Sequence, residues 1–325
     1  MNYSTILITG CAGFIGFNFT QYMIQKYPKV HFIGVDKLSY CSNLQEVVKL
    51  DLNHSNFDFV KCNLLHIKSL KSIFKRYSIE VVIHFAAYTH VDLSFGNSIK
   101  FTKHNVLATH CLLETARLAE IKRFIHVSTD EVYGSKDSIS TENSSLDPTN
   151  PYAATKAGAE YIVRSYYHSY KMPVIITRGN NVYGPYQYPD KLMPLFCLNL
   201  SQKKKCNIQG SGKQLRSFLY VSDAVKAFEI ILLKGKISEI YNIGSKDEVS
   251  VLEVHRRLCQ KFKLNANEYL NFIEDRPFND HRYTMNSNKL KGLGWKQEIE
   301  LDEGLNKCID WYCQKYDQIK HLKLE

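Results

Sequence analysis

The chain has 325 residues, enough for one large domain with a smaller lobe, and its nine cysteines include no Cys-x-x-Cys pair, which argues against a disulfide framework and a structural zinc site. No apolar run approaches the ~18 residues of a membrane helix, and no secretion signal precedes the first strand, so we expect a soluble cytoplasmic protein without a membrane partner. The formal net charge of +10 suits attraction of anionic small molecules such as nucleotides; because basic residues are dispersed among acidic ones, a nucleic-acid partner is the disfavoured alternative.

The first predicted strand, residues 5–9, runs into a glycine-rich turn and then a helix. Gly10, Gly13 and Gly16 have the spacing of loops that bind a pyrophosphate, because glycine lets the backbone approach the phosphates and the helix N-terminus faces their charge. An ordinary turn between a strand and a helix is the alternative, since this spacing alone is a weak signal.

The second predicted strand, residues 32–35, favours the dinucleotide interpretation. It ends in Asp36, about 20 residues after Gly16, where a carboxylate holds the ribose hydroxyls of adenosine. A carboxylate there repels a 2′-phosphate, so NAD is favoured over NADP, although Lys37 beside it works against this preference.

Further strands are predicted along the chain, with helical patterns between them. The strands cover residues 57–60, 81–86, 124–128, 174–177 and 240–243, and the clearest helices cover 105–119 and 152–170. This alternation predicts an α/β fold with a Rossmann-type, doubly wound parallel sheet.

Composition changes after residue 179, where tyrosine, proline and glycine become frequent, and after residue 248, where the chain is mostly helical and polar. We therefore expect residues 1–179 and 218–248 to form the NAD-binding domain. Residues 180–217 and 249–325 would form a smaller C-terminal lobe that binds the substrate.

The stretch between residues 128 and 156 carries the reactive side chains. Thr129, Asp130 and Glu131 follow an apolar run and should lie where a buried strand ends, the edge at which open α/β sheets bind ligands. Tyr152 and Lys156 lie four residues apart at the start of a helix, hence on one face, where an ammonium can stabilise a phenolate. Singly, each feature is more often an ordinary turn or a helix surface; together they predict an active site.

These features resemble the extended short-chain dehydrogenase/reductase superfamily, and Ser-Thr-Asp-Glu-Val-Tyr-Gly at residues 128–134 resembles its nucleotide-sugar 4,6-dehydratases. The resemblance covers nearly the whole chain, including residues 84–94, 181–191, 216–223, 241–244, 275–283 and 293–295.

Some positions differ from the bacterial dTDP-glucose dehydratases. Asn63-Leu64 stands where those enzymes have Asp-Ile, and the segments Arg216-Ser217-Phe218 and Asp275-Arg-Pro-Phe-Asn-Asp280 also differ. These variants look more like the UDP-glucose 4,6-dehydratase domain of bifunctional rhamnose synthases.

The resemblance implies a set of binding residues. Those implied for NAD are Gly10, Gly13, Phe14, Ile15, Gly16, Asp36, Lys37, Asn63, Leu64, Phe85, Ala86, Ala87, Tyr152 and Lys156. Those implied for the substrate are Thr89, Thr129, Asn181, Lys191, Leu192, Arg216, Asn242, Asp275, Arg276 and Tyr283. No metal is expected, because His84, His90 and His126 are not paired with other ligand types at metal spacing.

The resemblance also implies a division of chemical labour. Tyr152 would deprotonate the C4 hydroxyl while NAD takes the C4 hydride, and Thr129 would hydrogen-bond the C4 oxygen. Glu131 would then remove the C5 proton, Asp130 would protonate the departing C6 hydroxyl, and the hydride would return to C6. Tyr152 can act near neutrality only if its pKa of ~10 falls by roughly 3 units, which we expect Lys156 and the nicotinamide ring to supply.

The sequence thus predicts conversion of UDP-glucose to UDP-4-keto-6-deoxyglucose, with dTDP-glucose as the alternative substrate. A non-catalytic cofactor sensor or a nucleic-acid-binding protein is the remote alternative. The rhamnose synthases' second domain is absent from this sequence, so we expect a downstream epimerase/reductase on a separate chain.

The helices at residues 105–119 and 152–170 predict a homodimer. They carry apolar or aromatic residues on more than one face, namely Leu112, Leu113, Tyr161, Val163 and Tyr166, and relatives pair these helices into a four-helix interface. Sedimentation at micromolar concentration should give the mass of a dimer, and a monomeric mass would contradict the prediction.

Overall fold

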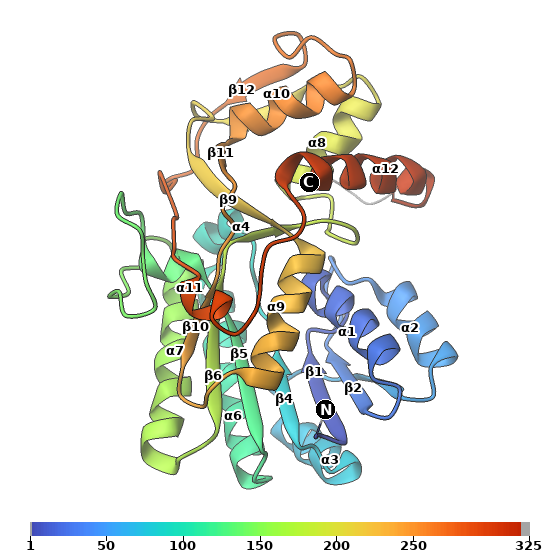
Figure 1. Ribbon diagram of the computed structural model, residues 1–325, viewed down its shortest axis with the longest axis vertical. Helices are drawn as coiled ribbons and strands as arrows, with labels where there is room; N and C mark the ends of the chain where they lie inside the picture. Colours follow the sequence, from blue (N-terminus) through green and yellow to red (C-terminus); the bar gives the residue numbers. More distant parts are fainter. Residues whose placement is uncertain (1, 320–325) are drawn as a thin grey trace.

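The computed structural model describes residues 2–319 and is organised around a seven-stranded parallel sheet (Figure 1). Its strands, in sheet order, are β10 (Ile240–Ile243), β6 (Val174–Gly179), β5 (Arg123–Thr129), β4 (Val81–His84), β1 (Thr5–Thr9), β2 (His31–Asp36) and β3 (Phe57–Lys61). The chain builds outward from β1 to β3 and then returns to build from β4 to β10, so the order reverses between β1 and β4. Ligands bind at this type of switch point. The predicted fold class is confirmed.

Helices cover both faces of the sheet because alternate strand residues point to opposite sides. Ile6 and Ile8 of β1 belong to a core shared with α1 (Phe14–Lys26), α2 (Leu44–Asn53) and α9 (Val221–Lys234). Leu7 belongs to a second core shared with α3 (Ile67–Tyr77), α6 (Ala108–Leu118) and α7 (Pro151–Tyr170). Both faces are therefore buried, which explains the nearly continuous apolar strands.

The remaining elements lie mainly beyond the carboxyl ends of the strands, at the top of Figure 1. β11 (Glu248–Ser250), β9 (Leu215–Tyr220) and β7 (Asn181–Tyr183) form one small sheet, and β12 (Leu270–Ile273) pairs with β8 (Cys206–Gln209). The helices here are α8 (Leu192–Ser201), α10 (Val251–Lys261) and α12 (Leu301–Ile319), while α11 (Asn288–Lys291) lies beside β10. The division of the chain into a cofactor domain and a substrate lobe stays a prediction.

The helix predicted over residues 105–119 is interrupted. After α4 (Val91–Gly96) and α5 (Ser98–Phe101), a π-helical turn, η1 (Thr102–Leu107), precedes α6. Asn105 lies in this turn, and its side chain bonds the backbone N–H and C=O of Tyr88 at 2.7 and 2.9 Å and the hydroxyl of Thr155 at 3.0 Å. Such π turns occur often at functional sites, and this one ties η1 to α7.

The apolar residues that motivated the dimer prediction lie mostly inside the protomer. Leu112, Leu113 and Val163 are fully buried in the core beneath the sheet, and Tyr166 is nearly so; only Tyr161 is exposed. That part of the argument is wrong, because the helix faces in question pack on the sheet. Other apolar side chains on these helices remain exposed, namely Leu107, Leu118 and Tyr170, and the dimer stays a prediction that now rests on them and on Tyr161.

All nine cysteines lie in the described part of the chain and are free, and seven are buried. Buried thiols pack as small apolar groups. Within residues 2–319, no helix is long and apolar enough to cross a membrane, and no group of three metal-ligating side chains is placed to hold an ion.

Candidate active site

Two adjacent carboxyl groups lie where β5 ends, Asp130 buried and Glu131 partly buried. Asp130 opens a short 3-10 turn, η2 (Asp130–Tyr133), and is 3% exposed. It accepts hydrogen bonds from the Asn180 amide at 2.6 Å and the Thr129 hydroxyl at 3.1 Å. Glu131 accepts one from the Asn150 amide at 3.0 Å. Neutral donors thus satisfy the carboxyl oxygens without forming an ion pair with them.

This burial sets the protonation of the pair. Burial raises the pKa of Asp130 to about 6. Burial, and then the neighbouring charge of Asp130, raise the pKa of Glu131 to about 7. Near neutral pH the pair therefore passes through a state with one proton shared between two carboxyls. One acid and one base side by side is the condition that acid–base elimination requires.

Tyr152 and Lys156 lie on the first turns of α7, close to this pair. Asn150 caps the helix, because its side-chain oxygen accepts the Ala153 N–H at 2.8 Å. The same side chain bonds Glu131, so one residue fixes both the start of α7 and a catalytic carboxyl.

The expected effect of Lys156 on Tyr152 needs correction. The Lys156 ammonium donates to the Val127 carbonyl at 2.6 Å, and burial lowers its pKa to about 8. Burial, and next the charge of Glu131, raise the pKa of Tyr152, while a hydrogen bond with Thr129 opposes them. The ammonium is aimed at the backbone of β5, so it does not lower the pKa of the phenol in this arrangement. The contribution of the nicotinamide ring stays a prediction.

The glycine loop lies against the end of β4. Gly10 has a φ of +73°, and a Cβ there would lie 2.6 Å from the Ala86 nitrogen. A Cβ at Gly16 would lie 2.1 Å from the Gly10 carbonyl oxygen. Side chains at either position would force the turn apart, so the close approach needed for a pyrophosphate depends on glycine.

Asp36 is held beside this loop by the backbone. Its carboxylate accepts the Leu38 N–H at 2.8 Å and the Ala12 N–H at 3.2 Å. Burial raises its pKa, whereas these two bonds act in the opposite direction. The carboxylate therefore has a fixed position at the end of β2, adjacent to the glycine turn.

A cavity of about 650 Å³ is lined by Lys37, Asn63 and Tyr88. The Lys37 ammonium donates to the Tyr88 hydroxyl at 2.6 Å. Asn63 accepts the Leu65 N–H at 3.1 Å, which fixes the turn after β3. A cavity of this size accommodates an adenosine group. With the glycine loop and Asp36, it makes a site that fits an adenine dinucleotide.

The other predicted cofactor residues lie along the same edge. Gly13 precedes α1 and Phe14 and Ile15 begin it; Leu64 follows β3; Phe85, Ala86 and Ala87 follow β4. Parallel strands end at one edge, which is why segments distant in sequence meet here.

Three predicted substrate residues lie together in the lobe. Arg216 of β9 donates to the Asn279 side-chain oxygen at 3.0 Å, and its guanidinium lies 4.8 Å from the centre of the Tyr283 ring. Asp275 accepts from the Asn279 amide at 2.9 Å. The positive charge of Arg216 also lowers the pKa of Asp130 and Glu131, although burial outweighs it. Arg216 therefore acts electrostatically on the catalytic pair.

The chain matches the protein family described as GDP-mannose 4,6-dehydratase over residues 7–308. It belongs to the nucleotide-sugar 4,6-dehydratases of the extended short-chain dehydrogenase/reductase type. The expected resemblance is confirmed.

Individual relatives agree with this assignment. The chain is 47% identical over 352 residues to a dTDP-D-glucose 4,6-dehydratase of Dictyostelium discoideum, covering 94% of this chain and 81% of the relative. It is 47% identical over 316 residues to a trifunctional UDP-glucose 4,6-dehydratase/epimerase/reductase of Arabidopsis thaliana, covering 95% of this chain but 47% of that protein. A dTDP-glucose 4,6-dehydratase from Streptomyces venezuelae, solved with NAD and TYD bound, has a TM-score of 0.94 at 34% identity and covers 98% and 100% of the two chains.

Not every predicted substrate residue of this dehydratase reaches the site. Asn242 is fully buried; its side chain accepts from the Tyr133 hydroxyl at 2.7 Å and donates to the Asn286 carbonyl at 3.0 Å. The structure thus contradicts a substrate contact for Asn242. Arg276 forms an ion pair with Asp92 of α4 at 3.2 Å, which connects the lobe to the segment after β4.

The remaining substrate residues lie in connecting segments. Thr89 and Asn181 are exposed, and Lys191 and Leu192 are partly buried at the start of α8. Burial lowers the pKa of Lys191, and the neighbouring Asp190 opposes that effect.

Sequence reasoning missed several polar residues that hold the site together, namely Tyr88, Asn150, Asn180 and Asn279. Asn150 could have been found, because Asn before Pro is a helix-start signal. For Asn180 and Asn279, no local pattern marks which distant residue each contacts.

Asp36→Ala tests the cofactor assignment. Removing the carboxylate should weaken NAD binding by ~1–3 kcal/mol, the range for a hydrogen bond to a charged group. Isothermal titration calorimetry measures this directly, with Asp58→Ala on β3 as the control, since Asp58 pairs with His31 outside the site. Tighter binding of NADP than of NAD by the unmodified protein would contradict the assignment.

Proposed function

We propose that this dehydratase converts a nucleotide-activated glucose to its 4-keto-6-deoxy derivative by oxidation at C4, elimination of water across C5 and C6, and reduction at C6. The observation that carries the proposal is the Asp130–Glu131 pair, one carboxyl buried and the other partly buried, with both pKa values raised towards neutrality, beside Tyr152 at the sheet's carboxyl edge. A carboxyl pair with these pKa values suits a reaction in which one proton is removed and another is delivered nearby.

The residues at this edge fit NAD, which supplies reversible hydride acceptance when bound. The glycine loop leaves room for a pyrophosphate, and Asp36 faces the position of ribose hydroxyls. NAD in related solved dehydratases supports the same cofactor here. Tyr152 is the base for the C4 hydroxyl, a role that requires the charge of a bound nicotinamide ring to lower the phenol pKa that burial raises in the chain alone. Thr129, bonded to both Tyr152 and Asp130, orients the C4 oxygen.

Elimination requires an ionised Glu131 to remove the C5 proton and a protonated Asp130 to assist departure of the C6 hydroxyl. In the chain alone Glu131 has the higher pKa, so the shared proton favours Glu131. This preference of about one pKa unit corresponds to about 1.4 kcal/mol, which does not exceed a hydrogen bond to a charged group, worth ~1.5–3 kcal/mol. The bound sugar hydroxyl beside Asp130 would therefore reverse it.

UDP-glucose is the substrate we favour, because Arg216-Ser217-Phe218 and residues 275–280 resemble the UDP-glucose dehydratase domains. The trifunctional relative named for that activity is 47% identical over nearly the whole of this chain. dTDP-glucose is the second candidate: a relative of equal identity is named for it, and the Streptomyces structure supports the same choice. The product would pass to an epimerase/reductase on another chain.

Incubating the protein with UDP-glucose and dTDP-glucose in parallel tests the choice. We expect a higher kcat/KM for UDP-glucose, by roughly 5- to 10-fold, because the two substrates differ by the thymine methyl group and the ribose 2′-hydroxyl, each of which changes binding by ~1 kcal/mol. Mass analysis of the 4-keto-6-deoxy products measures both rates. A higher kcat/KM for dTDP-glucose would make dTDP-glucose the assigned substrate. The absence of product from both substrates would refute the proposed function.

Glu131→Gln separates oxidation from elimination. The variant should still oxidise C4 but lose elimination by ~10²- to 10⁴-fold, because the base for the C5 proton is gone. Tyr152→Phe should block the earlier oxidation instead. Rapid-quench mass analysis in deuterium oxide distinguishes the 4-keto-hexose from a 6-deoxy product labelled at C5. Dehydration by Glu131→Gln at the unmodified rate would remove Glu131 from its role.

A further inference from the structure

Arg178, on β6, has a buried guanidinium that contacts three separate parts of the segment between residues 133 and 160. It donates to the Tyr133 hydroxyl at 2.8 Å and to the Glu142 carbonyl at 3.3 Å. Its ion pair with Glu160 measures 2.7 Å, and the two side chains are 2% and 0% exposed. Neither the fit to NAD nor the proposed proton transfers involve these groups.

The three partners lie on three successive parts of the segment that carries the proposed catalytic residues. Tyr133 ends the η2 turn that begins with Asp130 and Glu131. Glu142 lies in the loop between η2 and α7, and Glu160 lies one turn after Lys156 on α7. One planar guanidinium therefore holds the turn, the loop and the helix at fixed separations, a task suited to its rigid array of donors.

A second set of bonds orients the same turn. The Tyr133 hydroxyl accepts from Arg178 and donates to the Asn242 side chain at 2.7 Å, so both its hydrogen-bonding roles are used. The backbone N–H of Asn242 donates to the Glu142 carboxylate at 3.1 Å. Turn and loop are thereby attached to β6 and β10, two adjacent strands of the sheet.

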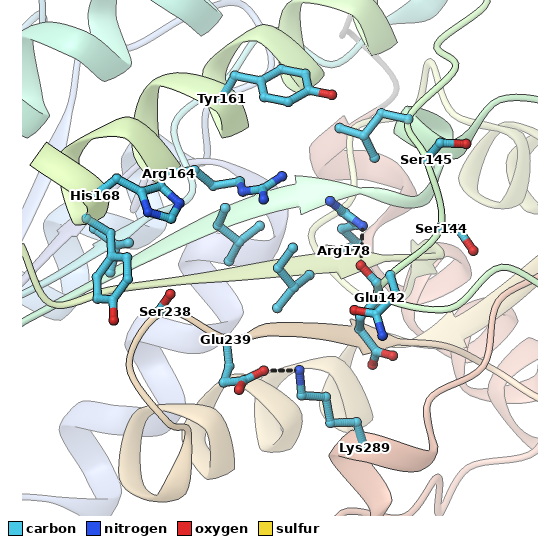
Figure 2. A pocket seen from close by; sticks show the side chains of 16 residues that line it. Glu142, Ser144, Ser145, Tyr161, Arg164, His168, Arg178, Ser238, Glu239 and Lys289 are labelled. Carbon is cyan, nitrogen blue, oxygen red and sulfur yellow. Dashed lines mark hydrogen bonds and ion pairs between the residues drawn. The ribbon is translucent and has the colours of Figure 1, made fainter.

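A cavity of about 380 Å³ adjoins this network on the outer side of the sheet edge (Figure 2). Arg178 and Glu142 meet at one wall, and the Glu239–Lys289 ion pair lies at another. The cavity lies beside Arg178 and the loop that contains Glu142, so side chains do not fill this side of their contact. The contact between Arg178 and this loop therefore depends on the hydrogen bond to the Glu142 carbonyl.

We propose that Arg178 and Tyr133 are positioning residues that hold Asp130 and Glu131 against the sugar for elimination. The proposal rests on the proposed function and deepens it. The Tyr133 hydroxyl bonds Arg178 and Asn242, whereas Asn150 caps α7 and the Val127 carbonyl accepts from Lys156. Loosening η2 therefore impairs the step that uses the two carboxyls and leaves the Tyr152 step intact.

Tyr133→Phe is the sharpest test, because it removes one hydroxyl and keeps the buried ring. Removing Arg178 entirely would instead leave the Glu160 carboxylate buried and unpaired, which destabilises the whole fold. Tyr133→Phe should lower kcat by ~10- to 100-fold with KM nearly unchanged. Rapid-quench analysis should show the 4-keto-hexose accumulating with reduced cofactor, ahead of any C5-deuterated 6-deoxy product.

Tyr241→Phe is the matched control. Tyr241 is as buried as Tyr133, and its hydroxyl accepts the Lys236 N–H at 2.9 Å, away from the catalytic segment. This variant should lose thermal stability comparably and accumulate no 4-keto-hexose. Arg178→Lys provides a second variant: it retains the charge paired with Glu160 but lacks the fork that reaches all three partners, so it should repeat the accumulation.

The outcomes separate this inference from the proposed function. Wild-type protein that forms no 6-deoxy product would overturn both. If the wild type is active, any of three results would overturn the positioning role alone. The first is normal turnover by Tyr133→Phe and Arg178→Lys, and the second is an equal slowing of oxidation and of elimination in these two variants. The third is accumulation of the 4-keto-hexose by Tyr241→Phe. Accumulation in the first two variants only would establish the role.

Discussion

The site depends on two carboxyl groups that lie side by side, one buried and one partly buried. Burial at the end of β5 raises the pKa of Asp130 and of Glu131, and the charge of Asp130 raises that of Glu131 further. A strong cationic partner would remove this effect by holding both carboxylates ionised. The structure instead supplies amide donors from Asn180 and Asn150, which satisfy the oxygens while leaving the protons free to move.

That arrangement requires Asn150 and Asn180 to be held rigidly, because an amide donates a hydrogen bond to a carboxyl only within a narrow range of distances. Asn150 obtains its position from the start of α7, and Asn180 directly follows β6. The charge of Arg178 is used in its buried pair with Glu160. The charge of Arg216 does act on the two carboxyls and lowers their pKa values, but burial outweighs it.

The part of the site that fits the cofactor depends on a different constraint, which is that backbone atoms of the glycine loop lie very close together. Gly10 and Gly16 permit contacts that any side chain would prevent, and Asp36 takes its position from backbone N–H groups. The two sides meet because parallel strands end at a common edge and the strand order reverses between β1 and β4.

The sequence by itself determined the fold class, the glycine turn, Asp36 and the set from Thr129 to Lys156, because strand periodicity, glycine spacing and helical spacing are local properties. Only the tertiary structure decided the partners of those residues. It directed Lys156 to the Val127 carbonyl and buried Asn242 against Tyr133. It also turned Leu112, Leu113 and Val163 inward, since a helical pattern does not reveal which apolar face meets a sheet. Hydrogen bonds between residues 29 and 109 positions apart depend on how the strands assemble, and no local pattern encodes that assembly.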